Sequence, residues 1–310
     1  MTVLVMEICV DSVESAIAAV RGGADRLELC SNLANGGGLT PSLGLFREVK
    51  NAVGPTVPIM IMIRPRTGSF LYSEAEIEVM KQDIRIFKEE GASGVVFGVL
   101  TTYGQINVET TRQLVNEALP LQVCFHRAFD MTQDPHAALQ HLYSIPGITR
   151  VLTSGHGKIA TSPSSLSILS DLHKESIQHY HSLTRPHPWH SRADSASSTS
   201  STTSQLRAAP TEPITILPGS GISPNTVQIL VAILLRVGLK EIHLSAGQFV
   251  ESEMQYRKKT GREDSDAIGM GMGEWKVWKT DEHVVRQMRA IIDRAAAASP
   301  PGINGLPQGG

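Results

Sequence analysis

Eight short apolar segments alternate with helix-length segments along this 310-residue chain, and this alternation predicts an α/β fold, a TIM (β/α)8 barrel. Strands separated by helices pair in parallel, and roughly 250 residues of regular chain accommodate eight such units. A doubly wound open sheet is the alternative. The Gly-x-Gly-x-x-Gly turn typical of that fold is absent after the first predicted strand.

Each predicted strand is followed by its helix. The first four pairs are 3–10 with 12–23, 26–30 with 42–54, 58–65 with 74–91, and 94–100 with 107–119. The last four pairs are 121–130 with 134–145, 150–155 with 164–180, 214–221 with 223–238, and 241–247 with 281–298. Ser12 is expected to cap the first helix, which Gly22 and Gly23 end.

The sequence predicts one domain, residues 1–296, interrupted by a low-complexity insertion at 182–212. The Ser/Thr-rich centre of the insertion has little to bury and is expected to be disordered, as is the tail 297–310. The histidine-rich stretch at the front of this segment, 179–190, is either a metal site or a polar surface loop. A polar surface loop is the simpler interpretation.

Composition excludes several function classes. The formal net charge of −2 gives no electrostatic case for a nucleic-acid partner. The N-terminal residues have no basic region typical of a signal peptide, and the longest apolar run, 227–239, is too short for a membrane span. Three cysteines indicate no disulfide framework. We therefore expect a cytoplasmic protein with no nucleic-acid or membrane partner.

Polar side chains sit on the same face of several predicted strands. Side chains two apart share a face, so the polar sets should point into the barrel and the aliphatic sets toward the helices. Barrel enzymes keep their chemistry at the carboxyl ends of strands. The candidate catalytic residues are Glu7, Glu28, Arg64, His126 and Asp130. The alternative is a set of structural ion pairs.

Cys9 and Cys30 end neighbouring predicted strands. Adjacent strands lie about 4.8 Å apart, so two inward sulfurs could share one soft metal ion such as Cu(I). Zinc fits less well because no paired CxxC spacing is present. The alternative is that the cysteines, together with Met60 and Met62, are ordinary core residues that bind no metal.

A possible anion site follows the last two predicted strands. Loops after strands seven and eight of TIM barrels often bind phosphate through backbone N–H groups. The residues at this position are Gly219, Ser220, Gly221 and Ser245. The same glycines could merely form tight turns, and the reaction class cannot be read from the spacing.

Several stretches in the same order resemble the CutC copper homeostasis protein family: MEICVDSVESAIAAVRGGADRLELCSNLANGGGLTPS, MIRPRTGSFLYSEAEIEVMKQDI, FHRAFDM, RVLTSG, PGSGI and HLSAG. The resemblance covers most of residues 4–296. It implies a cytoplasmic, usually oligomeric TIM barrel linked to copper, with Cys9 and Cys30 as the Cu(I) pair. The family has no settled reaction.

The sequence departs from the family pattern at the Ser/Thr insertion and at Ser220, where the family often has Gly. Two other function classes stay open. One is an enzyme acting on a small anionic or phosphorylated metabolite, and the other is a scaffold whose activity lies in its oligomer surface.

Replacing residues 195–204 by a short Gly/Ser bridge should leave the melting temperature close to that of the full chain. Such polar, low-complexity sequence cannot offset its ordering entropy. Thermal unfolding followed by circular dichroism measures this. A large drop in melting temperature would mean that the segment packs on the barrel.

Overall fold

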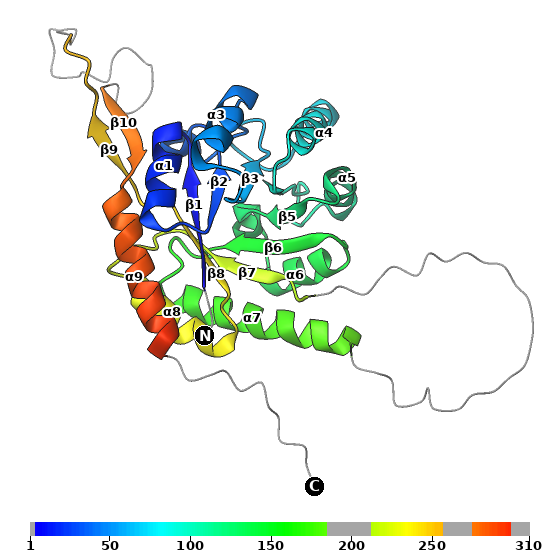
Figure 1. Ribbon diagram of the computed structural model, residues 1–310. Helices are drawn as coiled ribbons and strands as arrows, with labels where there is room; N and C mark the ends of the chain where they lie inside the picture. The colour runs from blue at the N-terminus through cyan, green and yellow to red at the C-terminus, as the bar shows by residue number, and fades with distance from the viewer. Residues whose placement is uncertain (1–3, 185–211, 257–274, 299–310) are drawn as a thin grey trace, which may run out of the picture.

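Eight parallel strands form a nearly closed barrel surrounded by helices in the computed structural model, which describes residues 4–184, 212–256 and 275–298 (Figure 1). The hydrogen-bonded order is β7-β6-β5-β4-β3-β2-β1-β8, and β7 lies beside β8. The predicted TIM-barrel class is confirmed.

All eight predicted strands are present. They are β1 (Val5–Val10), β2 (Arg26–Leu29), β3 (Ile59–Met62), β4 (Gly94–Phe97), β5 (Gln122–Phe125), β6 (Ile148–Thr153), β7 (Thr215–Pro218) and β8 (Glu241–Leu244). The outer helices are α1 (Val13–Gly22), α3 (Leu43–Val53), α4 (Glu74–Glu89), α5 (Val108–Ala118), α6 (Pro135–Tyr143), α7 (Pro163–Thr184), α8 (Val227–Leu234) and α9 (Glu282–Ala298).

Smaller elements lie between these units. They are α2 (Leu33–Gly36), the 3-10 helices η1 (Arg127–Met131) and η2 (Leu235–Val237), and the antiparallel hairpin of β9 (Gly247–Glu251) and β10 (Lys276–Thr280). The hairpin, which was not predicted, projects from the barrel beside α1 and α9 (Figure 1). Most of the predicted insertion and tail, residues 185–211 and 299–310, lies outside the described residues.

Local sequence sets the helix ends. Ser12 accepts a hydrogen bond from the backbone N–H of Ser15 at the start of α1, and Gly23 ends that helix in the left-handed conformation with φ 101°. Helix α4 begins with a capping box between Ser73 and Glu76. These are the caps that satisfy otherwise unpaired backbone groups at helix ends.

The strands separate two apolar cores, as the alternation of side chains predicted. Ile8, Leu27 and Ile61 belong to the large core between the barrel and the helices. A second, smaller core is composed of Cys30, Met60, Met62, Val96, Cys124, Leu152 and Leu217. Because Met60, Met62 and Cys124 alternate with the outward aliphatic residues, this second core fills the barrel interior.

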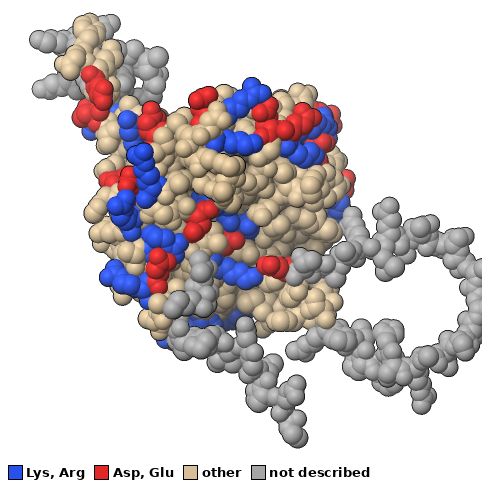
Figure 2. Space-filling model, in the orientation of Figure 1, with Lys and Arg blue, Asp and Glu red and all other residues tan. Residues whose placement is uncertain are grey.

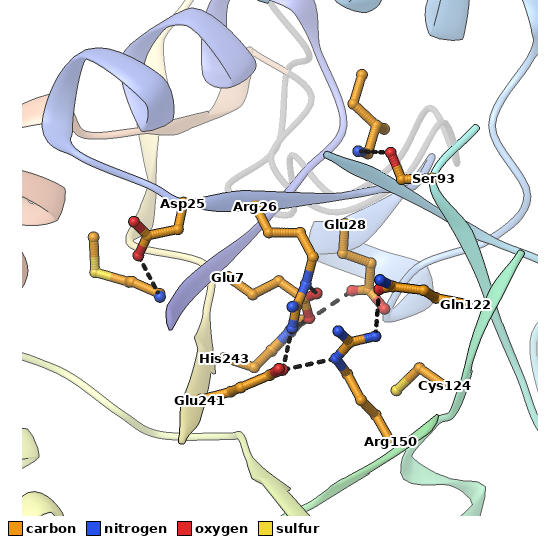
Figure 3. Close-up of polar contacts among 12 residues, drawn as sticks. Glu7, Asp25, Arg26, Glu28, Ser93, Gln122, Cys124, Arg150, Glu241 and His243 are labelled. Carbon is orange, nitrogen blue, oxygen red and sulfur yellow. Dashed lines mark hydrogen bonds and ion pairs between the residues drawn. The ribbon is translucent and has the colours of Figure 1, made fainter. Parts of the chain in front are cut away.

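A chain of buried ion pairs crosses the barrel interior below its mouth (Figure 3). Arg26 Nε lies 2.5 Å from Glu7 Oε2, and the other end of the same guanidinium pairs with Glu241. Arg150 Nε lies 2.8 Å from Glu241, and Arg150 Nη1 donates to Gln122 at 2.7 Å. These contacts join β1, β2, β5, β6 and β8 through side chains alone.

Glu7 is the acidic residue shared between this network and the mouth. Its other carboxylate oxygen lies 2.8 Å from His243 Nδ1. Burial alone would raise the pKa of the Glu7 carboxyl, but the charges and hydrogen bonds of Arg26 and His243 lower it from 4.5 to about 2. Glu7 is therefore held in its ionised form.

On the face shown in Figure 2, Lys and Arg side chains are interspersed with Asp and Glu. Among the helices of the described residues, none combines the length and apolar character that crossing a membrane requires.

Replacing Arg26 by Met should lower the free energy of unfolding by about 3–5 kcal/mol, because Glu7 and Glu241 would lose a buried partner. Arg85→Met is the matched control, since its pair with Glu117 is partly exposed and is worth about 0.2–1 kcal/mol. Urea unfolding measures both. Equal losses would show that the interior pairs do not hold the barrel together.

Glu7 should also make the folded state sensitive to acid. Because its folded pKa lies below the unfolded value, its contribution is complete above pH 4.5 and is lost as the pH falls toward about 2. Urea unfolding of wild type and Glu7→Gln across this range should give a stability difference that shrinks with falling pH. A difference independent of pH would contradict the assignment.

Candidate functional site

A cavity of about 340 Å³ opens at the carboxyl ends of the barrel strands. Seven of the predicted site residues line it, namely Cys9, Glu28, Arg64, His126, Ser220, Gly221 and Ser245. His243 of β8 and Trp278 of the β9–β10 hairpin also contribute to the lining. A volume of this size accommodates a small metabolite.

One wall of the cavity gathers three buried polar residues from β1, β2 and β8. Cys9 is the register partner of Glu28, and Glu7 is the register partner of His243. One ligand atom each from Cys9, Glu28 and His243 lies within 4.8 Å of the other two. Thiol, carboxylate and imidazole are all metal-binding groups, so this wall has the composition of a metal site.

Burial and mutual charge shift the pKa values of this wall. Burial raises the pKa of the Glu28 carboxyl to about 7, and burial also raises the pKa of the Cys9 thiol. Burial disfavours the His243 imidazolium, but Cys9, Glu28 and Glu7 together raise its pKa well above the usual value. Glu28 Oε1 is buried without a hydrogen-bond partner among the described residues.

Cys30 lies beside this wall and does not line the cavity. Its Sγ contacts Glu28 Oε2 at 3.7 Å and packs beneath Gly38. A Cβ at Gly38 would approach Cys30 Sγ to 3.2 Å, and Gly38 adopts φ 90°, so glycine is required there. Cys124, the third cysteine, is buried in the barrel interior, where burial raises the pKa of its thiol well above the usual value.

A second wall of the cavity carries cationic and aromatic side chains. They come from the segment that follows β3 and from the end of β5. Arg64 lies over the Phe70 ring with its Cζ 5.0 Å from the centroid. The Phe70 and His126 rings lie with centroids 4.8 Å apart. We call Arg64, Phe70 and His126 the cationic wall.

In the loop after β7, two hydrogen-bond donors are already used within the protein. The Gly219 N–H donates to Thr153 O, so Gly219 cannot offer it to a ligand, and Gly219 does not line the cavity. Ser220 lines the cavity but its hydroxyl donates to Lys158 O. Ser220 adopts φ 84°, a conformation that favours glycine.

Two other predicted residues lie away from the cavity. Glu7 lies in the layer beneath it, and Asp130 accepts hydrogen bonds from Thr153, Ser154 and Arg127. Asp130 thereby ties η1 to the end of β6. Its role in the structure is to join two segments.

The sequence reasoning missed the residues that complete the interior network, which are Arg26, Gln122, Arg150 and Glu241. Arg26 shares the face of Glu28, and Glu241 shares the face of His243, so strand alternation could have found both. Arg150 could not have been paired from sequence, because its partner Glu241 is 91 residues away.

Known proteins resemble this chain over most of its length. The family model described as the CutC family matches residues 4–179. The chain is 40% identical over 288 residues to a human copper homeostasis protein cutC homolog, covering 92% of this chain and 88% of that protein. It is 35% identical over 292 residues to a family protein CutC of Salmonella enteritidis, covering 94% and 98%.

A solved structure shares the fold. A CutC protein from Streptococcus agalactiae aligns with a TM-score of 0.60 and 24% sequence identity, covering 78% of this chain and 99% of that chain. The family model and the relatives cover most of the barrel and the strands that carry the cavity. The chain therefore belongs to the CutC family.

Proposed function

We propose that this protein acts in copper homeostasis by binding Cu(I) at the barrel mouth, with Cys9 as the central ligand. The observation that carries the proposal is the close grouping of Cys9, Glu28 and His243 on the wall of an open cavity. The relatives named as copper homeostasis proteins support the same role.

The donor set suits a soft cation. Thiolate sulfur and imidazole nitrogen are ligands that Cu(I) accepts readily, and hard carboxylate oxygen is not. We assign Cys9 and His243 as the ligands at the cavity surface and Cys30 as the second sulfur behind them. Glu28 lies in contact with Cys30 and 3.6 Å from His243 Nε2, where it can orient both.

Zinc is the competing cation for these residues. A site with three protein ligands of sulfur, nitrogen and oxygen, open to a cavity, is also the arrangement of catalytic Zn²⁺. The two cations make different demands on the site, because zinc would use the Glu28 carboxylate and Cu(I) would use Cys30. Variants of these two residues therefore distinguish them.

A cytoplasmic location and a homo-oligomeric assembly also belong to this proposal. Both rest on the resemblance to the family, and the barrel mouth does not depend on either. In this proposal copper is cargo that the protein binds.

Anaerobic titration of the purified protein with Cu(I) against a competing chelator should reveal one bound ion. Cys9→Ser and Cys30→Ser should each weaken binding by more than about tenfold, because each removes a sulfur of the proposed site, Cys9 from the cavity wall and Cys30 from beside Glu28. Cys124→Ser is the matched control, since Cys124 is also a free, buried thiol inside the barrel.

Wild-type affinity in both Cys9→Ser and Cys30→Ser would overturn the copper proposal. A parallel titration with Zn²⁺ resolves the identity of the cation. Tight zinc binding that Glu28→Gln abolishes and Cys30→Ser leaves intact would assign the wall to zinc.

A further inference from the structure

We propose that the cationic wall, Arg64, Phe70 and His126, binds the oxyanion group of a small metabolite, a carboxylate or a phosphate. The wall faces the same cavity as Cys9, Glu28 and His243, which we call the Cys9 wall, but its residues follow different strands, β3 and β5. The inference goes beyond copper binding and does not depend on it. It gives the cavity a small organic ligand as well as a metal ion.

His126 presents an unused hydrogen-bond donor. Its Nδ1 accepts a hydrogen bond from the backbone N–H of Ala128 at 3.2 Å, so that nitrogen carries a lone pair. In a neutral imidazole the proton then resides on Nε2. Nε2 is buried and has no partner among the described residues, although His126 lines the cavity and is only 3% exposed.

The surroundings keep this imidazole neutral. Burial and the positive charge of Arg64 together lower the pKa of His126 to about 3. Gly98 makes room for the ring, because a Cβ there would lie 2.6 Å from His126 Nδ1. His126 is thus fixed as a neutral donor at its Nε2 edge. Leaving a buried donor unpaired costs free energy, which a ligand acceptor would recover.

Arg64 supplies the charge. Its guanidinium donates to Gly36 O at 2.7 Å, to Gly38 O at 3.1 Å and to Gly68 O at 3.4 Å. These acceptors are neutral carbonyls, and Arg64 forms no ion pair with an acidic side chain in the part of the chain that the structure describes. The carbonyls position the guanidinium without neutralising it, so its positive charge is available to an anion.

Among the cationic side chains that line the cavity, Arg64 is better placed than Arg127 to bind an anion. Arg127 also lines the cavity, but Asp130 lies 2.8 Å from it and offsets its charge. The backbone N–H groups of Ser220 and Gly221 donate to no acceptor within the described residues, and both residues line the cavity. Backbone donors after the seventh strand are a common place for oxyanions in this fold.

Calorimetric titration of the metal-free protein with inorganic phosphate and with malonate tests the proposal and separates the two oxyanion classes. Malonamide, the neutral analogue of malonate, is the control ligand. At least one of the two anions should bind and malonamide should not. Arg64→Gln and His126→Phe should each weaken that anion by about tenfold or more, since each removes a donor to a charged group.

Arg85→Gln, which removes a surface guanidinium that does not line the cavity, should bind the anion as wild type does. The anion titrations use metal-free protein, so a failed copper site and a failed anion site remain distinguishable. Circular dichroism establishes that each variant is folded. No binding of either anion, or wild-type affinity in both Arg64→Gln and His126→Phe, would overturn the proposal.

A measurement on wild type covers the case in which the variants fail to fold. Nitrogen NMR of histidine-labelled protein should show His126 as the Nε2–H tautomer, with its Nε2 resonance shifting as the anion is added. A protonated Nδ1, or an Nε2 resonance that anion saturation leaves unmoved, would contradict the assignment.

Discussion

The carboxylate of Glu7 connects the stability of the barrel to the chemistry at its mouth. One oxygen holds Arg26, which continues through Glu241 and Arg150 across the interior, and the other oxygen holds His243 (Figure 3). A buried carboxylate is costly without partners, and here it has two. Because Glu7 fixes Nδ1 of His243, the opposite ring nitrogen is directed toward Glu28.

This arrangement explains why the polar residues inside the barrel divide into two layers. The lower layer is paired internally. The upper layer keeps unused groups, such as Glu28 Oε1 and His126 Nε2, at the cavity. The lower layer consists of structural ion pairs, and binding at the upper layer is our proposal.

The alternation of apolar and helix-length segments was enough to predict the fold, and the period of two along each strand predicted part of the cavity lining. It placed Cys9, Glu28, Arg64 and His126 correctly at the mouth. It failed where the chain leaves the strand geometry. Asp130 lies in η1, which turns its carboxylate toward β6 and away from the cavity.

Other features depend on contacts that no local pattern encodes. The identity of the protonated nitrogen in His126 follows from a single backbone N–H at Ala128. Glu241 meets Arg26 and Arg150 only when the barrel closes between its first and last strands. The β9–β10 hairpin brings Trp278 to the cavity from a segment in which the sequence showed no regular pattern.

X-ray absorption spectroscopy of the Cu(I)-loaded protein tests most directly whether the Cys9 wall is the metal site. On this assignment, wild type should show sulfur and imidazole scattering in the nearest shell, with loss of a sulfur in Cys9→Ser and loss of the imidazole in His243→Gln. A copper ligand shell that is the same in wild type and in both variants would contradict it.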